Sequence, residues 1–439
     1  MAKERKEKSL APEALRAARA ALAQARGRRR LDLILDAKDP QALVRSLPAD
    51  ELYLTIREVG LGDAVPIVQL ASPAQFKVFL DLEAWSRGAF DPRRTLPWLR
   101  AARAGAHLEP RAAARWERKL AALDPEVLFL VLRDAVRLHD LEEDPDPEFA
   151  SDRFMRTPEG KYVVEFAVEG VEYAAVRGLL DDLYAEDPFK ATRLLSAIRF
   201  ETPSELEESA LRWRTGRLAD LGWPSLEEAL SWFARPPRAP AHAAGPPARP
   251  GGFFLAALAH GTLLDRAVAR LDPDGQDRVE ANLAAAANAV LVADAVDPGD
   301  LDAVRSAFEA ARAYLELGLE GLAGGDEERA AAVLDETPLK RVFQHGFGRV
   351  LELSWRARRI LERAGEGTRL GSPLDEALAA LAARRPRYFP GLEAPRSAWG
   401  TAEAAAHAPR HFRSSAELER AEEALLLAEA KLAAGGGAG

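Results

Sequence analysis

Hydrophobic residues recur along the chain at a spacing near 3.6 residues, in segments of about 10 to 20 residues separated by short polar connections. This spacing places apolar side chains on one face of an α-helix. The pattern therefore predicts an all-α fold of short helices stacked side by side, in a superhelical or repeat-like order.

Proline marks the expected helix starts. An Asp, Ser or Thr side chain can accept a bond from a first-turn amide, and proline suits the next position because no intrahelical bond is lost there. Starts are expected at the prolines that follow Asp39, Ser72, Asp91, Asp124, Asp187, Thr202, Asp272, Asp297, Thr337 and Ser372. Reciprocal capping boxes are expected for Ser72 with Gln75, Ser204 with Glu207, and Ser225 with Glu228.

One segment breaks the helical pattern. In "FMRTPEGKYVVEFAVEG", residues 154–170, side chains alternate around a Pro-Glu-Gly turn. Alternation with a period of two is typical of strands, and two strands joined by a short turn form a hairpin. We therefore expect a single small β-hairpin near 154–168, packed on the helices.

Composition predicts the domain organisation. The stretch "RPPRAPAHAAGPPARPGG", residues 235–252, is too rich in Pro, Ala and Gly for a helix or strand, which indicates a linker. The expected parts are a charged N-terminal helix over 1–30, an N-terminal helical domain with the hairpin over 31–234, this linker, a C-terminal helical domain over 253–413, and a C-terminal helix with a disordered tail over 414–439.

Two segments resemble each other. "LPADELYLTIREV", from Leu47, aligns with "LDPEVLFLVLRDA", from Leu123. Such similarity between 47–60 and 123–136 is typical of a stacked helical repeat. Two unrelated amphipathic helices would produce it as well, because helical patterns converge. Both interpretations remain open.

Composition excludes several functions. The chain has 439 residues, a formal net charge of -9 and no cysteine. The negative charge provides no overall basic field for nucleic acid or anionic lipid. The lack of cysteine excludes disulfides, thiolate metal sites and thiol nucleophiles. No stretch approaches the roughly 18 apolar residues of a membrane span, and we expect a cytoplasmic location.

The stretch "SPAQFKVFLDLEAW", residues 72–85, places polar groups within an apolar surrounding. On a helix its apolar side chains fall on two opposite faces, which suits an element between neighbours. Asp81 and Glu83 point in different directions, so they do not form a converging carboxylate pair. A buried carboxylate needs a partner, and Arg87 lies four residues after Glu83. We expect a structural Glu–Arg pair; the alternative is a partner-binding surface.

The segment 338–365 has a strongly amphipathic pattern. Its expected inner stripe is Phe343, Phe347, Val350, Ser354, Ala357, Leu361 and Ala364. The reverse face combines arginines with an aromatic residue, which favours phosphate, nucleic acid or an acidic helix as a partner. The candidate partner-binding residues are Arg349, Trp355, Arg356, Arg359 and Arg363. The alternative is a solvated face whose arginines pair with the protein's own carboxylates.

Motifs for metals and cofactors fail on their spacing. His407 and His411 are four residues apart, but Pro409 between them spoils a helical metal pair. The segment "DPDGQDRVE", from Asp272, has glycine at the fourth position instead of the sixth of a calcium loop. We expect no metal and no cofactor.

Three functions remain open. The first is a protein-binding scaffold or regulatory protein whose partner is another protein. The second is an enzyme or small-ligand-binding protein whose site forms in the N-terminal domain, with Gln75, Glu83, Arg57 and His139 as candidates. The third is a nucleic-acid contact through the arginine stripe 341–363, for which the net negative charge is unfavourable.

The runs "LPADELYLTIREVGLGDAVPIVQLASPAQFKVFLDLEAW", "GLLDDLYAEDPFKATRLLSAIRFETPSELEE" and "LGWPSLEEALSWF" resemble an uncharacterised family of bacterial proteins, a domain of unknown function. The resemblance continues through "LKRVFQHGF" and "RPRYFPGL" and implies no activity, because that family has none established. The succession "LPADEL", "LASPAQ" and "FLDLE" is also similar in style to the N-terminal superhelical domains of magnesium transporters and of a flagellar motor switch protein.

Overall fold

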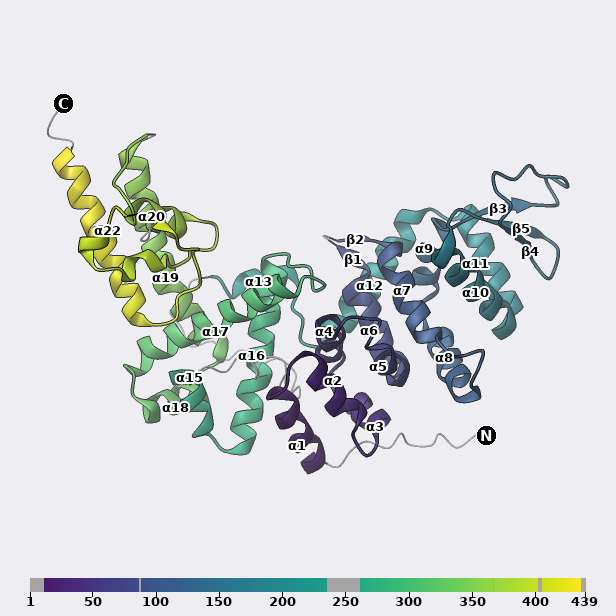
Figure 1. The fold of residues 1–439 in the computed structure, drawn as a ribbon, viewed down its shortest axis with the longest axis horizontal. Helices are drawn as coiled ribbons and strands as arrows, with labels where there is room; N and C mark the ends of the chain where they lie inside the picture. Colours follow the sequence, from purple (N-terminus) through teal and green to yellow (C-terminus); the bar gives the residue numbers. More distant parts are fainter. Residues whose placement is uncertain (1–11, 87, 235–260, 366, 402–404, 436–439) are drawn as a thin grey trace. The chain divides into compact units, whose positions relative to one another are not determined.

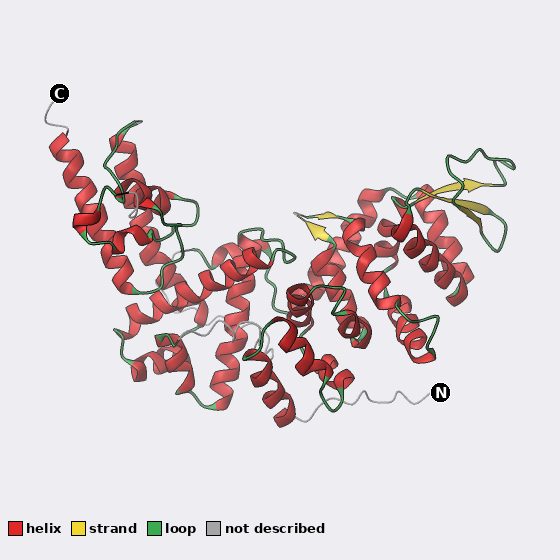
Figure 2. Cartoon of the chain, in the orientation of Figure 1, coloured by secondary structure: helices red, strands yellow, loops and turns green. Residues whose placement is uncertain are grey.

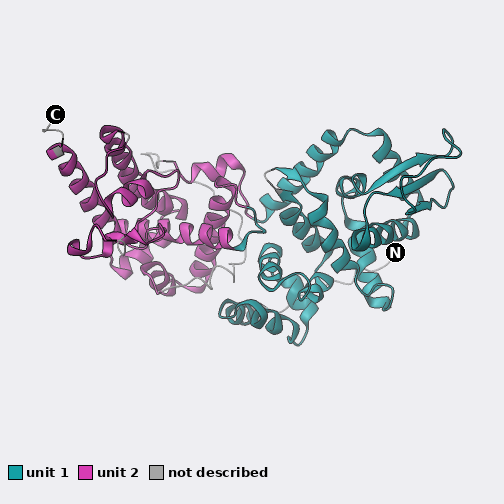
Figure 3. Cartoon of the chain, turned by 45° about the horizontal axis from the view of Figure 1, so that its top comes forward, with its two compact units in different colours: residues 1–221, 297–301 teal, residues 222–296, 302–439 magenta. Residues whose placement is uncertain are grey.

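The computed structural model of the protein describes residues 12–86, 88–234, 261–365, 367–401 and 405–435. The chain forms two compact units, shown in different colours in Figure 3. Unit 1 comprises residues 1–221 and 297–301, and unit 2 comprises residues 222–296 and 302–439. The predicted linker over 235–252 lies outside the described residues.

Helices dominate both units (Figures 1 and 2), and the described residues contain 20 α-helices. The expected all-α class is therefore confirmed. Strands are confined to unit 1, among the described residues.

The helices of unit 1 are α1 (Pro12–Ala23), α2 (Gly27–Leu35), α3 (Pro40–Ser46), α4 (Ala49–Val59), α5 (Val65–Leu70), α6 (Pro73–Glu83), α7 (Pro92–Arg103), α8 (Pro110–Ala122), α9 (Pro125–Arg133), α10 (Gly170–Glu186), α11 (Pro188–Phe200) and α12 (Pro203–Asp220). Its strands are β1 (Trp85–Ser86), β2 (Ala89–Phe90), β3 (Val136–Asp140), β4 (Phe154–Arg156) and β5 (Tyr162–Phe166).

The α-helices of unit 2 are α13 (Leu226–Ser231), α15 (Leu263–Ala269), α16 (Pro273–Ala293), α17 (Leu301–Ala323), α18 (Glu327–Glu336), α19 (Leu339–Ala364), α20 (Leu374–Ala382) and α22 (Ser415–Gly435). Two short 3₁₀ helices, η1 (Pro390–Glu393) and η2 (Arg396–Ala398), lie between α20 and α22.

The proline signal locates most of the helix starts that it predicts. Helices α3, α6, α7, α9, α11, α12 and α16 begin at the proline after the expected capping residue. In α6, Ser72 Oγ accepts a bond from Gln75 N at 3.2 Å, and Gln75 Oε1 accepts one from Ser72 N at 2.9 Å. The same capping box joins Ser225 and Glu228.

Three predicted starts and one capping box are wrong. Near Asp297, Thr337 and Ser372 the helices begin after the proline, at Leu301, Leu339 and Leu374. The expected box of Ser204 and Glu207 does not form, because α12 already begins at Pro203 and Ser204 lies inside its first turn. The Glu207 carboxylate instead accepts a bond from the Phe90 amide at 3.0 Å.

The predicted hairpin is confirmed as β4 and β5, and a third strand joins it. Strand β3 pairs antiparallel with the other edge of β5, with Val136 opposite Phe166, which gives the order β3-β5-β4. All five residues of β5 are buried, so both faces of the central strand are covered. The sheet lies beside α9, α10 and α11 in unit 1 (Figure 1); Tyr162 Oη and Ser196 Oγ of α11 are 3.0 Å apart.

The core of unit 1 centres on α6, which packs against α4, α7, α8 and α12. The Tyr53 and Trp98 rings stack with their centroids 5.5 Å apart. The Phe79 ring also packs on Trp98, with the two centroids 5.6 Å apart. Both apolar faces of α6 are buried, as its two-faced pattern predicts for an element between neighbours.

In unit 2, α17 and α19 cross at two glycines. A Cβ atom on Gly346 would lie 1.9 Å from Tyr314 O, and one on Gly318 would lie 1.9 Å from Val342 O. Around this crossing, edge-to-face contacts join the rings of Trp232, Phe233, Tyr314, Phe343 and Phe347. The close backbone approach therefore sets the spacing at which these aromatic side chains pack.

The inner stripe predicted for α19 holds over most of the helix. Phe343, Phe347, Val350, Ser354 and Ala357 are buried. The last turn differs, because Leu361 is 40% exposed and Ile360 is buried instead. In the last turn, the buried face of α19 therefore passes through Ile360 instead of the predicted Leu361.

Gly346→Ala is expected to lower the free energy of unfolding by about 3 kcal/mol, because the α17 and α19 backbones would have to separate. Gly348, two residues later on α19, has no atom within 4 Å of a built Cβ. Gly348→Ala is therefore expected to raise stability by about 0.5 to 1 kcal/mol. Urea unfolding of both variants checks this, and equal effects would contradict the close crossing.

Candidate functional site

The carboxylate of Glu83 is engaged from three sides. Glu83 is 5% exposed, and its Oε2 accepts a bond from Tyr53 Oη at 2.8 Å. Its Oε1 lies 3.4 Å from both Arg57 Nη1 and Arg94 Nε. Arg87, the partner expected from the sequence, lies outside the described residues. The charge of Glu83 is thus compensated by cations from α4 and α7.

The two arginines also hold the 297–301 segment of unit 1. Arg94 forms a bidentate pair with Asp297 at 2.7 and 2.9 Å, and Arg57 Nη2 donates to Gly299 O at 2.8 Å. Paired charges and satisfied carbonyls of this kind are typical of a structural network, since Glu83, Arg57 and Arg94 all have partners inside the fold.

Asp81, on α6 as well, belongs to a different network. Asp81 is 3% exposed, and its two oxygens accept bonds from Arg217 of α12 at 2.6 and 2.8 Å. The third nitrogen of this guanidinium donates to Asp124 at 2.6 Å, and Lys77 donates to Asp124 at 2.7 Å. The two carboxylates of α6 therefore bond to separate sets of cations and share no space for a substrate.

The structure brings together only part of the polar cluster suggested by the sequence. Arg57 and Glu83 are in contact. Gln75 instead donates to Val44 O at 2.7 Å and to Leu47 O at 2.9 Å, where it completes the end of α3. His139 lies in the sheet, with Nε2 3.0 Å from a Glu165 carboxylate oxygen.

The arginine stripe of α19 divides into engaged and exposed residues. Arg349 Nη1 donates to Leu317 O at 2.8 Å and to Ser415 Oγ at 3.0 Å. Arg356 forms a bidentate pair with Glu429 of α22 at 2.8 and 2.7 Å. Trp355, Arg359 and Arg363 are exposed.

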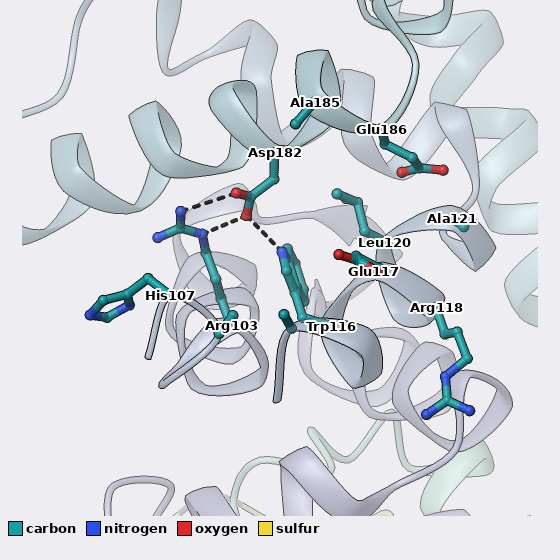
Figure 4. Close-up of a pocket in the computed structure, with 12 residues that line it drawn as sticks. Arg103, His107, Trp116, Glu117, Arg118, Leu120, Ala121, Asp182, Ala185 and Glu186 are labelled. Atoms are coloured by element: carbon teal, nitrogen blue, oxygen red, sulfur yellow. Dashed lines mark hydrogen bonds and ion pairs between the residues drawn. The ribbon is translucent and has the colours of Figure 1, made fainter. Parts of the chain in front are cut away.

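A groove that the sequence analysis missed opens in unit 1 where α7, α8 and α10 meet (Figure 4). Its volume is about 540 Å³. Small and aliphatic side chains line much of it: Ala106, Ala113, Leu120, Ala121 and Ala185.

The floor of the groove is a paired charge. The Asp182 carboxylate accepts bonds from Arg103 at 2.5 and 3.1 Å and from Trp116 Nε1 at 2.6 Å, drawn as dashed lines in Figure 4. Arg103 lies against Gly178, where an added Cβ would be 2.7 Å from Cζ of the guanidinium. The absence of a side chain at Gly178 of α10 thus leaves space for the ion pair. The hydrogen bond to Asp182 raises the pKa of Arg103.

The rim of the groove is polar and carries both signs of charge. His107, Glu117 and Arg118 line it as exposed residues, and Glu186 lines it with Oε1 4.0 Å from Lys190 Nζ. Leu108, next to His107 in the chain, is 74% exposed. The groove thus combines small apolar side chains, one ion pair and a rim of mixed charge.

Sequence reasoning could not find this groove, because its residues come from three helices and form no motif. The available signal was Trp116, an aromatic residue in the otherwise Ala- and Arg-rich segment "PRAAARWERKLAA". Neither the spacing nor the composition indicates that Asp182, 66 residues later, would accept its indole N–H.

Two negative findings apply to the part of the chain that the structure describes. There, no group of three or more His, Asp or Glu side chains could hold a metal ion. Among the described helices, none combines the length and the apolar composition needed to cross a bilayer.

The fold and the groove define a mainly α-helical protein with a small antiparallel sheet and a helix-lined surface groove. The chain belongs to a family of unknown function (DUF6178), whose sequence model matches residues 7–434. No curated protein and no solved structure matches the chain significantly.

Lys119 lies on α8 but outside the groove lining, and is 2% exposed. Its Nζ donates to Gln69 O at 2.9 Å. Burial, together with repulsion from Arg45, Arg115 and Arg118, lowers its pKa from 10.5 to about 7. Above pH 7 the unfolded chain therefore holds more protons at this site than the folded chain.

Stability is accordingly expected to rise with pH at this site, from about pH 7 toward 10.5, by at most about 1.4 kcal/mol per pH unit. Lys119→Met removes this contribution. In urea unfolding, the free energy of unfolding of the wild type should therefore rise relative to that of the variant between pH 7 and about pH 9.5. Lys38 is exposed, and Lys38→Met should show a difference that does not change with pH. A pH-independent difference for Lys119→Met would contradict the lowered pKa.

Proposed function

We propose that the protein is a cytoplasmic scaffold or regulatory protein that binds another protein through the groove between α7, α8 and α10. The observation that carries the proposal is the composition of the groove: an apolar wall, a floor whose charges are paired with each other, and a rim of mixed charge.

The floor of the groove favours binding over catalysis. A general acid or base must be free to exchange a proton with a substrate. Asp182 already accepts three bonds from Arg103 and Trp116, so its lone pairs and its charge are committed to the protein. The groove can still bury apolar surface of a partner, which is the main driving force of protein association.

The expected partner is an amphipathic helix that inserts an apolar side chain between Ala113, Ala121 and Ala185, lining residues with accessible apolar surface. Helices recognised in this way place anchors at i, i+3 and i+4 in a groove. Glu117 on the rim favours a basic residue beside the anchor, and Arg118 favours an acidic one.

Ala121→Arg tests the proposal by filling the groove. Ala121 is exposed on α8 and lines the groove, whereas Ala114, also exposed on α8, does not. Ala121→Arg is expected to weaken binding of the partner at least about tenfold, and Ala114→Arg to leave it unchanged. Parallel affinity capture from cell lysate with the three proteins identifies the partner, and titration of the purified partner measures the change.

Thermal unfolding of both variants shows whether folding is preserved, since each places one arginine at an exposed helical position. A partner that both variants retain, or that both lose, would contradict docking in the groove. So would a captured set of proteins that Ala121→Arg does not alter.

A further inference from the structure

A cavity of about 280 Å³ in unit 2 is built on one face of α17. Glu309, Arg312, Ala313 and Glu316 line it, and their spacing of three and four residues places them on the same side of the helix. Residues 410–413 form the facing wall, and Thr262, the N-cap of α15, contributes to the edge.

Several charges in the cavity wall already have partners. Both oxygens of Glu316 accept backbone bonds, from Leu263 N at 2.8 Å and Leu264 N at 2.9 Å, and so cap the start of α15. Arg410 bonds to Glu417 at 2.9 and 3.1 Å and to Glu393 at 3.0 Å. These groups shape the wall and leave little capacity for a ligand.

Two arginines that line the cavity have guanidinium nitrogens without a partner in the described structure. Arg312 is only 9% exposed and bonds to Asp265 through Nη2, which leaves Nε and Nη1 without a partner among the described residues. The guanidinium of Arg413 also has no partner there; its backbone amide alone bonds, to Glu417. Arg312 is partly buried and Arg413 is exposed, so both guanidinium groups can donate to an acceptor that enters the cavity.

His411 adds a neutral polar group. Its Nε2 lies 3.3 Å from Ser306 Oγ, and its Nδ1 is buried without a partner in the described structure. Burial and the nearby Arg387 lower the pKa of His411 to about 4, so the ring carries no charge at neutral pH. A neutral imidazole can donate to or accept from a ligand without adding to the charge of the site.

We propose that this cavity binds a small carboxylic acid with an apolar body. The carboxylate would accept bonds from Arg312 and Arg413, whose planar guanidinium groups match its two oxygens. The apolar body would pack on Ala313 and Phe412, which also line the cavity. A carboxylate suits the site better than a phosphate, because Glu309 and Glu316 would repel a second negative charge.

Benzoate, phenyl phosphate and benzyl alcohol share one apolar body and test the head group. Ligand-observed NMR titration of the full chain is expected to give saturable binding of benzoate, with both other probes weaker. Arg413→Gln should weaken benzoate about tenfold by removing a charged donor. Glu309→Gln should strengthen it by about threefold, because a repulsive charge is lost. Arg305→Gln, on α17 outside the lining, serves as the control and should have no effect.

Arg413 is exposed and its side chain has no described partner, so Arg413→Gln should keep the thermal unfolding of the wild type. The proposal is overturned if benzoate does not saturate the protein below about 10 mM. Equal affinity of wild type and Arg413→Gln would overturn it too. Benzyl alcohol binding as well as benzoate would show only an apolar hollow, and tighter phenyl phosphate binding would rule out a carboxylate preference.

Discussion

Asp81 of α6 accepts two hydrogen bonds from Arg217 of α12. Glu83, two residues later on the same helix, lies within ion-pair distance of Arg57 of α4 and Arg94 of α7. A helix buried on all sides can keep charged residues only if each is paired, because an unpaired buried charge costs several kcal/mol. The rest of unit 1 depends on this constraint: the neighbours of α6 must present their arginines at the two carboxylates.

The same constraint separates structural from functional polar groups in both units. Where a charge has its partner inside the fold, as Asp182 has in Arg103, the surface around it is free to bind apolar material without performing chemistry. Where a guanidinium has nitrogens without a partner in the described structure, as in Arg312 and Arg413, it can bind an anionic ligand as proposed for the cavity of unit 2. The two proposed binding sites thus differ in how completely their charges are satisfied.

The sequence predicts what depends on neighbours in the chain. Helix starts such as those of α6 and α11 follow from one capping residue and one proline, and the β4–β5 hairpin follows from alternation around a turn. Strand β3 escapes prediction because "VRLHD" is short, partly charged and continuous with α9, and its pairing with β5 is a tertiary contact. The groove escapes for the same reason, since Trp116 and Asp182 meet only after α8 and α10 pack. Arg57 and Glu83 contact each other, as the sequence suggests. No feature of the sequence indicates that Gln75 and His139 bond elsewhere.

A double-mutant cycle on Asp81 and Arg217 tests most directly whether the buried charges of α6 serve the fold. Asp81→Asn, Arg217→Gln and the double variant are compared with the wild type by urea unfolding. The account predicts that the losses of stability are non-additive, with a coupling energy of at least about 1 kcal/mol. Losses that add within about 0.5 kcal/mol would contradict it.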